Sequence, residues 1–197
     1  MGMTITEKIL CHHTEYKEVQ PGMLINAKLD KLMILKGKSW KFGDNISTDL
    51  IAPGRLFHLR SNLPELAKHV LEDADPDFAS KMTPGDFVVG GSNFGLGSSR
   101  EHAPTIIELA GVSAVIAQSF ARIFFRNAIN VGLPVIQCDT SGIETGDELE
   151  LNLEDGTLTN VTKGEKLTFS PLPGVMRKIL DDGGLLKHIE KHGDFVL

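Results

Sequence analysis

Short apolar runs alternate with amphipathic stretches through the middle of the chain. Apolar segments at 86–91, 113–118 and 133–138 predict three buried strands. Between them, residues 103–111 and 119–132 have the apolar spacing of helices. Because strands that alternate with helices pair in parallel, through right-handed crossovers, the middle of the chain predicts an α/β fold.

The ends of the predicted helices carry recognisable signals. Pro104 falls in the first turn of the earlier helix, and Gly111 follows its last apolar residue as a stop signal. For the later helix we expect Ser119 to be the N-cap, since a serine hydroxyl accepts a hydrogen bond from a first-turn N–H.

The flanking segments show other periods. Residues 34–42 predict a strand, and residues 63–74 have the apolar spacing of a helix. Residues 147–162 alternate by two around Asp155-Gly156, which predicts an antiparallel hairpin and hence a mixed sheet. Residues 174–193 predict one or two helices, broken at Gly183-Gly184.

Composition narrows the class of protein. The 197 residues are 41% hydrophobic and 23% charged, which suits one domain with an appendage or two small domains. A net charge of -6 argues against a nucleic-acid or anionic-membrane partner. No apolar run approaches the roughly 20 residues of a membrane span, and the N-terminus lacks a signal-peptide core. We therefore expect a cytoplasmic protein.

The two cysteines, Cys11 and Cys138, lie far apart and outside any CxxC pair. We expect reduced thiols and no metal or cluster site within this chain.

The stretch "GGSNFGLGSSREHAP", residues 90–104, carries the clearest candidate chemistry. It joins a predicted strand to a helix, where glycines let backbone amides approach a ligand and first-turn N–H groups lack partners. The hydroxyls of Ser98 and Ser99 can bond an anion, and Arg100 can hold a carboxylate through two hydrogen bonds. The pattern predicts an anion site for phosphate or carboxylate; a glycine-rich turn without a ligand is the alternative.

Three separated blocks closely resemble the swivel domain of the aconitase superfamily: residues 42–55, 90–104 and 119–136. The resemblance covers about residues 33–197 and implies a compact β/β/α domain with a mixed, partly barrel-like sheet. In arrangement the chain resembles the separate small subunits of 3-isopropylmalate dehydratase and homoaconitase.

The resemblance implies a hydro-lyase subunit that isomerises a hydroxy acid by dehydration and rehydration. Its iron–sulfur cluster is then expected on a large partner subunit, with no cofactor in this chain, which would be inactive alone. The isopropylmalate activity would belong to leucine biosynthesis. A non-catalytic anion-binding or scaffold module is the alternative from another class.

The same resemblance assigns roles to residues. Ser98 corresponds to the base that removes a proton next to a carboxylate, and Asp49 to an acidic residue that orients a neighbouring group. Ser99 and Arg100 correspond to ligands of the substrate carboxylate, and the loop backbone at Gly97 is expected to contribute to binding.

Arg60 lies in the loop that reads the variable group of the substrate in this family. An arginine there suits an additional carboxylate, as in aconitate or homoaconitate, whereas burying an isopropyl group against an unpaired guanidinium is costly. The overall arrangement favours isopropylmalate. Both substrates stay open, as does a solvent-facing Arg60.

Four other residues are expected outside the chemistry. His102 should support the loop from behind, and Arg122 and Arg126, four residues apart on a predicted helix, should form structural or interface salt bridges. His58 has no partner at ligand spacing.

Residues 1–32 resemble the start of an aconitase-type large subunit, so we place a domain boundary before Met33. A rearranged gene, an internal deletion or an altered start would each produce this junction, and the sequence does not choose among them.

Overall fold

The computed structural model describes Cys11, Gln20 and residues 34–194. Ile34–Leu197 forms a compact unit of its own. The domain boundary that the sequence places before Met33 stays a prediction.

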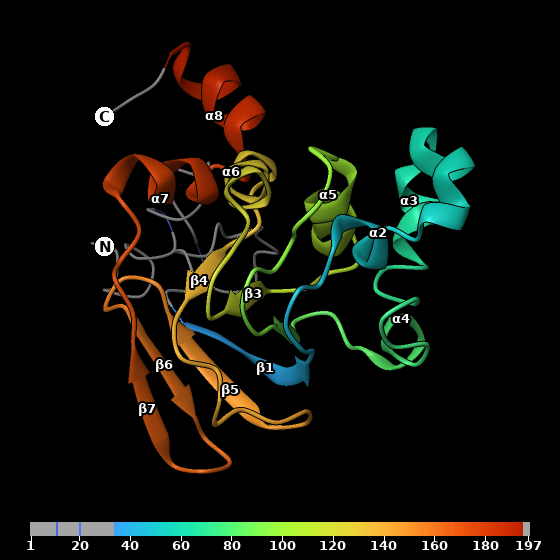
Figure 1. Ribbon diagram of the computed structural model, residues 1–197. Coiled ribbons are helices and arrows are strands. Elements are labelled where there is room, and N and C mark those ends of the chain that lie inside the picture. The colour runs from blue at the N-terminus through green and yellow to red at the C-terminus, as the bar shows by residue number, and fades with distance from the viewer. Residues whose placement is uncertain (1–10, 12–19, 21–33, 195–197) are drawn as a thin grey trace. The chain divides into compact units, whose positions relative to one another are not determined.

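A mixed sheet organises the described unit (Figure 1). In the described residues it has seven strands in the order β4-β3-β2-β1-β5-β6-β7. Strands β1 to β4 pair in parallel and β1, β5, β6 and β7 pair antiparallel, which confirms the predicted combination. The strands are β1 (Ile34–Lys41), β2 (Phe87–Val89), β3 (Ala114–Ala117), β4 (Val135–Gln137), β5 (Glu148–Asn152), β6 (Thr157–Asn160) and β7 (Glu165–Thr168).

Short helices connect and cover these strands: α2 (Thr48–Ile51), the 3-10 helix η1 (Gly54–Ser61), α3 (Leu63–Ala67), α4 (Phe78–Lys81), α5 (His102–Leu109), α6 (Arg122–Val131), α7 (Gly174–Asp181) and α8 (Leu185–His192). The helices predicted at 103–111 and 119–132 are confirmed, and the C-terminal segment forms two helices across Gly183-Gly184. No helix in the described part of the chain is long and apolar enough to cross a membrane.

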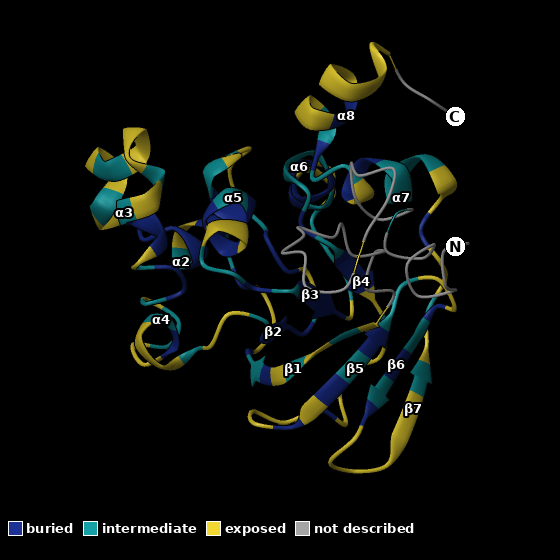
Figure 2. Cartoon of the chain, turned by 180° about the vertical axis from the view of Figure 1, so that it is seen from behind, coloured by how far each residue is buried: buried dark blue, intermediate teal, exposed yellow. Residues whose placement is uncertain are grey.

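Neighbouring residues of each central strand enter different hydrophobic cores, as the period of two requires. In β3, Val115 and Ala117 join the helix-side core, whereas Ala114 and Ile116 join a second core. Figure 2 shows these strands as buried segments. The second core also contains Ile136 of β4 and Leu158 of β6.

Four strands separate β4 from β6 in the sheet order, yet they share that second core. The sheet must therefore curl so that β5 and β6 approach the face of β2 to β4. This curl confirms the predicted partly barrel-like form.

The helix expected over residues 63–74 is only half correct, because α3 ends at Ala67 and residues 68–74 form turns. Leu71 has a φ of 57°, which is incompatible with a helix. Its N–H donates to the carbonyl of Ile51 at 2.9 Å, and its side chain is fully buried. Tertiary packing of Leu71 thus overrides the local helical spacing.

The N-cap prediction for Ser119 is wrong. The residue before α6 is Ala121, which gives no side-chain capping bond. Ser119 instead accepts the Asn93 N–H on its hydroxyl at 2.8 Å and the Phe94 N–H on its carbonyl at 2.9 Å. Its hydroxyl serves the glycine-rich loop and not the helix.

Strand β7 was not expected from the sequence. It completes a second hairpin after the turn at Gly164, whose φ is 70°, and Leu167 lies opposite Leu158 of β6. The two-residue alternation in this segment is too short to distinguish a strand from a polar loop.

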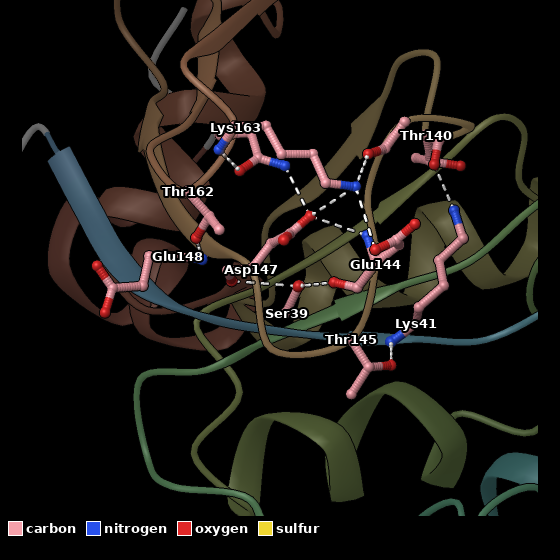
Figure 3. Close-up of polar contacts among 11 residues, drawn as sticks. Ser39, Lys41, Thr140, Glu144, Thr145, Asp147, Glu148, Thr162 and Lys163 are labelled. Carbon is pink, nitrogen blue, oxygen red and sulfur yellow. Dashed lines mark hydrogen bonds and ion pairs between the residues drawn. The ribbon is translucent and has the colours of Figure 1, made fainter.

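A buried polar network joins β1, the loop before β5 and the end of β6 (Figure 3). The carboxylate of Asp147, only 5% exposed, accepts the Glu144 N–H at 2.9 Å and the Asn160 amide at 2.7 Å. The ammonium of Lys163 lies 3.5 Å away. Burial alone raises the pKa of Asp147, but these hydrogen bonds and Lys163 outweigh it and hold the pKa below its ordinary value.

We expect Asp147→Ala to lower the free energy of unfolding by about 2–4 kcal/mol at pH 7, because Asn160 and Glu144 lose their buried acceptor. Since the pKa is lowered on folding, this contribution is complete above the ordinary aspartate pKa of about 4 and fades as pH falls through the lowered value. Urea unfolding at pH 7 and pH 3 measures both effects.

The exposed Glu154→Ala is the matched control and should change stability by less than about 0.5 kcal/mol. A gap between wild type and Asp147→Ala that stays constant from pH 7 to pH 3 would show that the carboxylate charge contributes nothing.

Candidate functional site

The three sequence blocks singled out above lie side by side, with the glycine-rich loop between the other two. On one side, the Thr48 N–H donates to Leu96 at 2.8 Å and the Gly95 N–H to Ile46 at 2.7 Å. On the other, the Ala121 N–H donates to the carbonyl of Phe94 at 2.9 Å. Segments far apart in sequence therefore converge on one loop.

Polar side chains hold the start of this loop. The carboxylate of Asp44 accepts the Ser92 N–H at 2.6 Å, and the Asn93 amide donates to Asn45 at 3.1 Å. The hydroxyl of Thr140 donates to the carbonyl of Gly90 at 2.8 Å. Nothing in the local sequence reveals the contact between Asp44 and Ser92, because the two residues lie 48 positions apart.

Gly95 brings the loop against α6. Its φ is 79°, and a Cβ at this position would overlap the ring of Phe124. The rings of Phe94 and Phe124 pack edge to face beneath the loop, with centroids 5.4 Å apart. Packing against α6 thus requires glycine here even without a ligand.

Most of the predicted site residues come together at the end of this loop. Ser47 caps α2 by accepting the Leu50 N–H at 3.2 Å, which places Asp49 in the exposed first turn. A guanidinium N–H of Arg100 donates to the carboxylate of Asp49. The hydroxyl of Ser98 lies 3.5 Å from that of Thr48.

Both serines at the loop end face solvent. Ser98 and Ser99 are exposed, and so is the Gly97 backbone that precedes them, with a φ of 115°. Their hydroxyls and amides are accessible to a molecule that approaches from outside the chain.

Arg60 and Arg100 lie near the same aromatic ring, that of Phe57. The central carbon of the Arg60 guanidinium lies 4.3 Å from the ring centroid of Phe57, and that of Arg100 lies 5.4 Å from the same centroid. Both arginines and His102 line a hollow of about 10 Å³. A space of this size holds about one water molecule, so the hollow is too small for a carboxylic acid.

Three other predicted residues lie outside this group. His58 is exposed on η1. Arg122 and Arg126 are exposed on α6, and within the described residues neither forms an ion pair. The expected salt bridges inside the chain are therefore missing from the part that the structure describes, whereas the interface alternative stays a prediction.

Potential metal-ligating groups lie elsewhere. Asp182, which follows α7, and His188 and His192 of α8 hold their ligand atoms within 4.8 Å of one another. However, the Lys191 ammonium lies 2.5 Å from the same Asp182 carboxylate. Burial, together with the nearby Asp139, raises the pKa of the Cys138 thiol to about 11, so it is a protonated and poor ligand at neutral pH.

Comparison with known proteins gives consistent results. The family model for the aconitase C-terminal domain matches residues 67–140. The "3-isopropylmalate dehydratase small subunit 2" of Archaeoglobus fulgidus is 64% identical over 162 residues, which cover 82% of this chain and 98% of the relative.

Two proteins of Methanocaldococcus jannaschii extend the similarity. Its "isopropylmalate/citramalate isomerase small subunit" is 54% identical over 160 residues, 80% of this chain and 95% of the relative. A crystal structure titled 3-isopropylmalate dehydratase (leuD) from the same organism superposes with a TM-score of 0.78 and 42% identity, covering 81% of this chain and 95% of that chain.

Proposed function

Because this chain belongs to the family of 3-isopropylmalate dehydratase small subunits, we propose that it isomerises 2-isopropylmalate to 3-isopropylmalate together with a large subunit. The reaction is a hydro-lyase dehydration followed by rehydration. The observation that carries this proposal on the chain itself is the cluster of Ser98, Asp49 and Arg100 at the end of the glycine-rich loop.

The chemistry of these side chains supports distinct roles. Ser98, as its alkoxide, takes the proton from the carbon next to a carboxylate. The electron pair of that C–H bond forms the double bond as the hydroxyl leaves the neighbouring carbon as hydroxide, which a Lewis acid on the large subunit would accept. Rehydration then places a hydroxyl on the carbon that lost the proton and a proton on the carbon that lost the hydroxyl. A serine is a weak base, so backbone amides and the Arg100 guanidinium must stabilise its anion.

Arg100 and Ser99 are proposed to bind the substrate carboxylate, with the backbone at Gly97 beside them. Arg100 contacts Asp49 in the free chain, so a substrate carboxylate competes with Asp49 for the same guanidinium. Asp49 then becomes available to orient a neighbouring donor. This exchange of partners is the role that we propose for Asp49 in the reaction.

The described residues do not fit an iron–sulfur cluster. Such clusters need several thiolates, and residues 34–197 contain one cysteine, Cys138, which is a protonated thiol. We therefore assign the cluster to the large subunit, which also makes this chain inactive alone. A cytoplasmic location stays a prediction from the sequence.

The second candidate substrate is a tricarboxylate of the aconitate or homoaconitate type. The observation that favours it is the position of Arg60, exposed and near Arg100 on the same aromatic ring. The names of the relatives favour isopropylmalate, and one also includes citramalate.

Reconstitution tests the proposal. The full chain is mixed anaerobically with its cognate large subunit and iron, and double-bond formation is followed from 2-isopropylmalate, citramalate, homocitrate and citrate. We expect turnover of 2-isopropylmalate only when both chains are present, since each supplies one part of the site.

The variant Arg60→Val refines this experiment. If Arg60 reads an additional carboxylate, the variant weakens the tricarboxylates more than the isopropyl acid; equal effects on both acids remove Arg60 from substrate selection. A tight complex without turnover of any of these acids would favour the scaffold module over the enzyme.

A further inference from the structure

A second hollow, bordered by two arginines, lies on the α6 side of the glycine-rich loop. It is a cavity of about 500 Å³, lined by Gly95, Gly97, Ala121, Arg122, Ile123 and Arg126. Small-molecule sites have volumes of this order, and the hollow beside Arg100 is far smaller. Gly97 directly precedes Ser98, so a molecule in this cavity lies alongside the backbone that carries the proposed base.

The charges around this cavity are arranged unfavourably for the chain alone. Arg122 and Arg126 lie one helical turn apart, where like charges repel. Arg122 also begins α6, and a cation at a helix N-terminus opposes the helix dipole. Ala121 gives the first-turn N–H groups no side-chain acceptor, and no carboxylate in the described residues pairs with either arginine.

An anion that enters the cavity relieves this arrangement. A carboxylate would separate the two guanidinium charges, accept their hydrogen bonds and complement the helix N-terminus. The net charge of the chain is -6, so this pair is a local exception and not part of a generally basic surface.

We propose that Arg122 and Arg126, with the loop backbone at Gly95 and Gly97, form a second carboxylate subsite for the substrate. The inference rests on the proposed function, because a hydroxy-dicarboxylate has two carboxylates to hold and the Arg100 group accounts for one. The loop backbone at Gly97 is shared by the two subsites and directly precedes Ser98, so one substrate would be held by both of its carboxylates beside the proposed base.

The test uses the reconstituted complex with Arg122→Gln, Arg126→Gln and the double variant. We expect KM for 2-isopropylmalate to rise about 10- to 100-fold in the double variant, the range of one lost charge-assisted contact, with kcat changed much less. The control Lys166→Gln/Lys187→Gln removes the same charge from exposed positions on β7 and α8 and should leave KM unchanged.

Binding of the two monoamides of 2-isopropylmalate shows whether the carboxylate held by Arg122 and Arg126 belongs to the substrate. The wild-type complex should bind the diacid more tightly than the monoamide that lacks the carboxylate of this subsite, and the double variant should lose that preference, measured by calorimetry without turnover. Equal losses for the diacid and both monoamides overturn the proposal. So does weaker assembly with the large subunit at unchanged KM, since the arginines would then bind a carboxylate of the partner protein.

Failure of the inference is distinguishable from failure of the proposed function. If the wild-type complex turns over and the double variant behaves like the control, only the inference fails. If the wild-type complex binds the diacid through Arg122 and Arg126 without converting it, the reaction assignment fails and the subsite stands; absence of any binding overturns both.

Discussion

Ser98→Ala is expected to lower kcat of the reconstituted complex by about 10³-fold, because proton transfer by a positioned side chain contributes roughly 10²- to 10⁴-fold. KM should stay within about threefold, since Arg100 and its neighbours still bind the carboxylate. Ser98 is exposed, and the contact of its hydroxyl with that of Thr48 is long, at 3.5 Å. Loss of this hydroxyl therefore opens no buried cavity. Steady-state kinetics with the wild-type large subunit measures the effect.

The matched control is Ser80→Ala on α4, an exposed serine whose hydroxyl donates only to the local Asp77 carbonyl at 3.0 Å. It should leave kcat and KM unchanged. If Ser98→Ala keeps more than about a tenth of the wild-type kcat while the complex assembles normally, another group removes the proton and the proposed role of Ser98 is wrong.

Gly95→Ala is expected to cost at least about 2 kcal/mol more stability than an alanine placed at another glycine with positive φ. Gly95 is buried with a φ of 79°, and its added Cβ would overlap the ring of Phe124. The strained backbone and the displaced ring act together. Chemical unfolding of the full chain, monitored by circular dichroism, measures the loss.

Gly146→Ala separates these two costs. Gly146 has a φ of 92°, and a Cβ there meets nothing within 4 Å, so this variant pays the backbone cost of about 1–2 kcal/mol alone. Similar losses in both variants would show that Phe124 yields easily and that the loop does not depend on this contact. We also expect Gly95→Ala, but not Gly146→Ala, to reduce turnover, because the displaced loop carries Ser98.

Much of the fold could be predicted from local pattern. Continuous apolar runs correctly identify β2, β3 and β4, and the turn at Asp155-Gly156 identifies the hairpin of β5 and β6. These signals suffice because burial on both faces and a short turn, here the four residues 153–156 between β5 and β6, leave direct traces in sequence.

The errors arose where a distant partner decides the local structure. Leu71 leaves the helical conformation to pack in the core and bond to Ile51, which lies 20 residues earlier in the sequence. Ser119 has the sequence position of a helix cap but bonds to Asn93. Local propensity contains no information on such contacts.

Some residues of the candidate site could be identified from the sequence and others could not. Sequence and resemblance together identified Ser98, Asp49 and Arg100, and the structure brings them together. Neither indicated that Arg122 and Arg126 border the same loop, because their spacing on a helix is equally typical of surface ion pairs. The roles of all these residues stay predictions.

The alternation along β3 has a consequence for how this protein can change. Val115 shares a core with Phe94 and Phe124 beneath the glycine-rich loop, whereas Ile116, its neighbour, packs with the hairpin strands. Substitutions in separate cores add almost independently. Evolution or redesign can therefore change thermal stability through substitutions in the second core, while the residues that pack beneath the glycine-rich loop keep their arrangement.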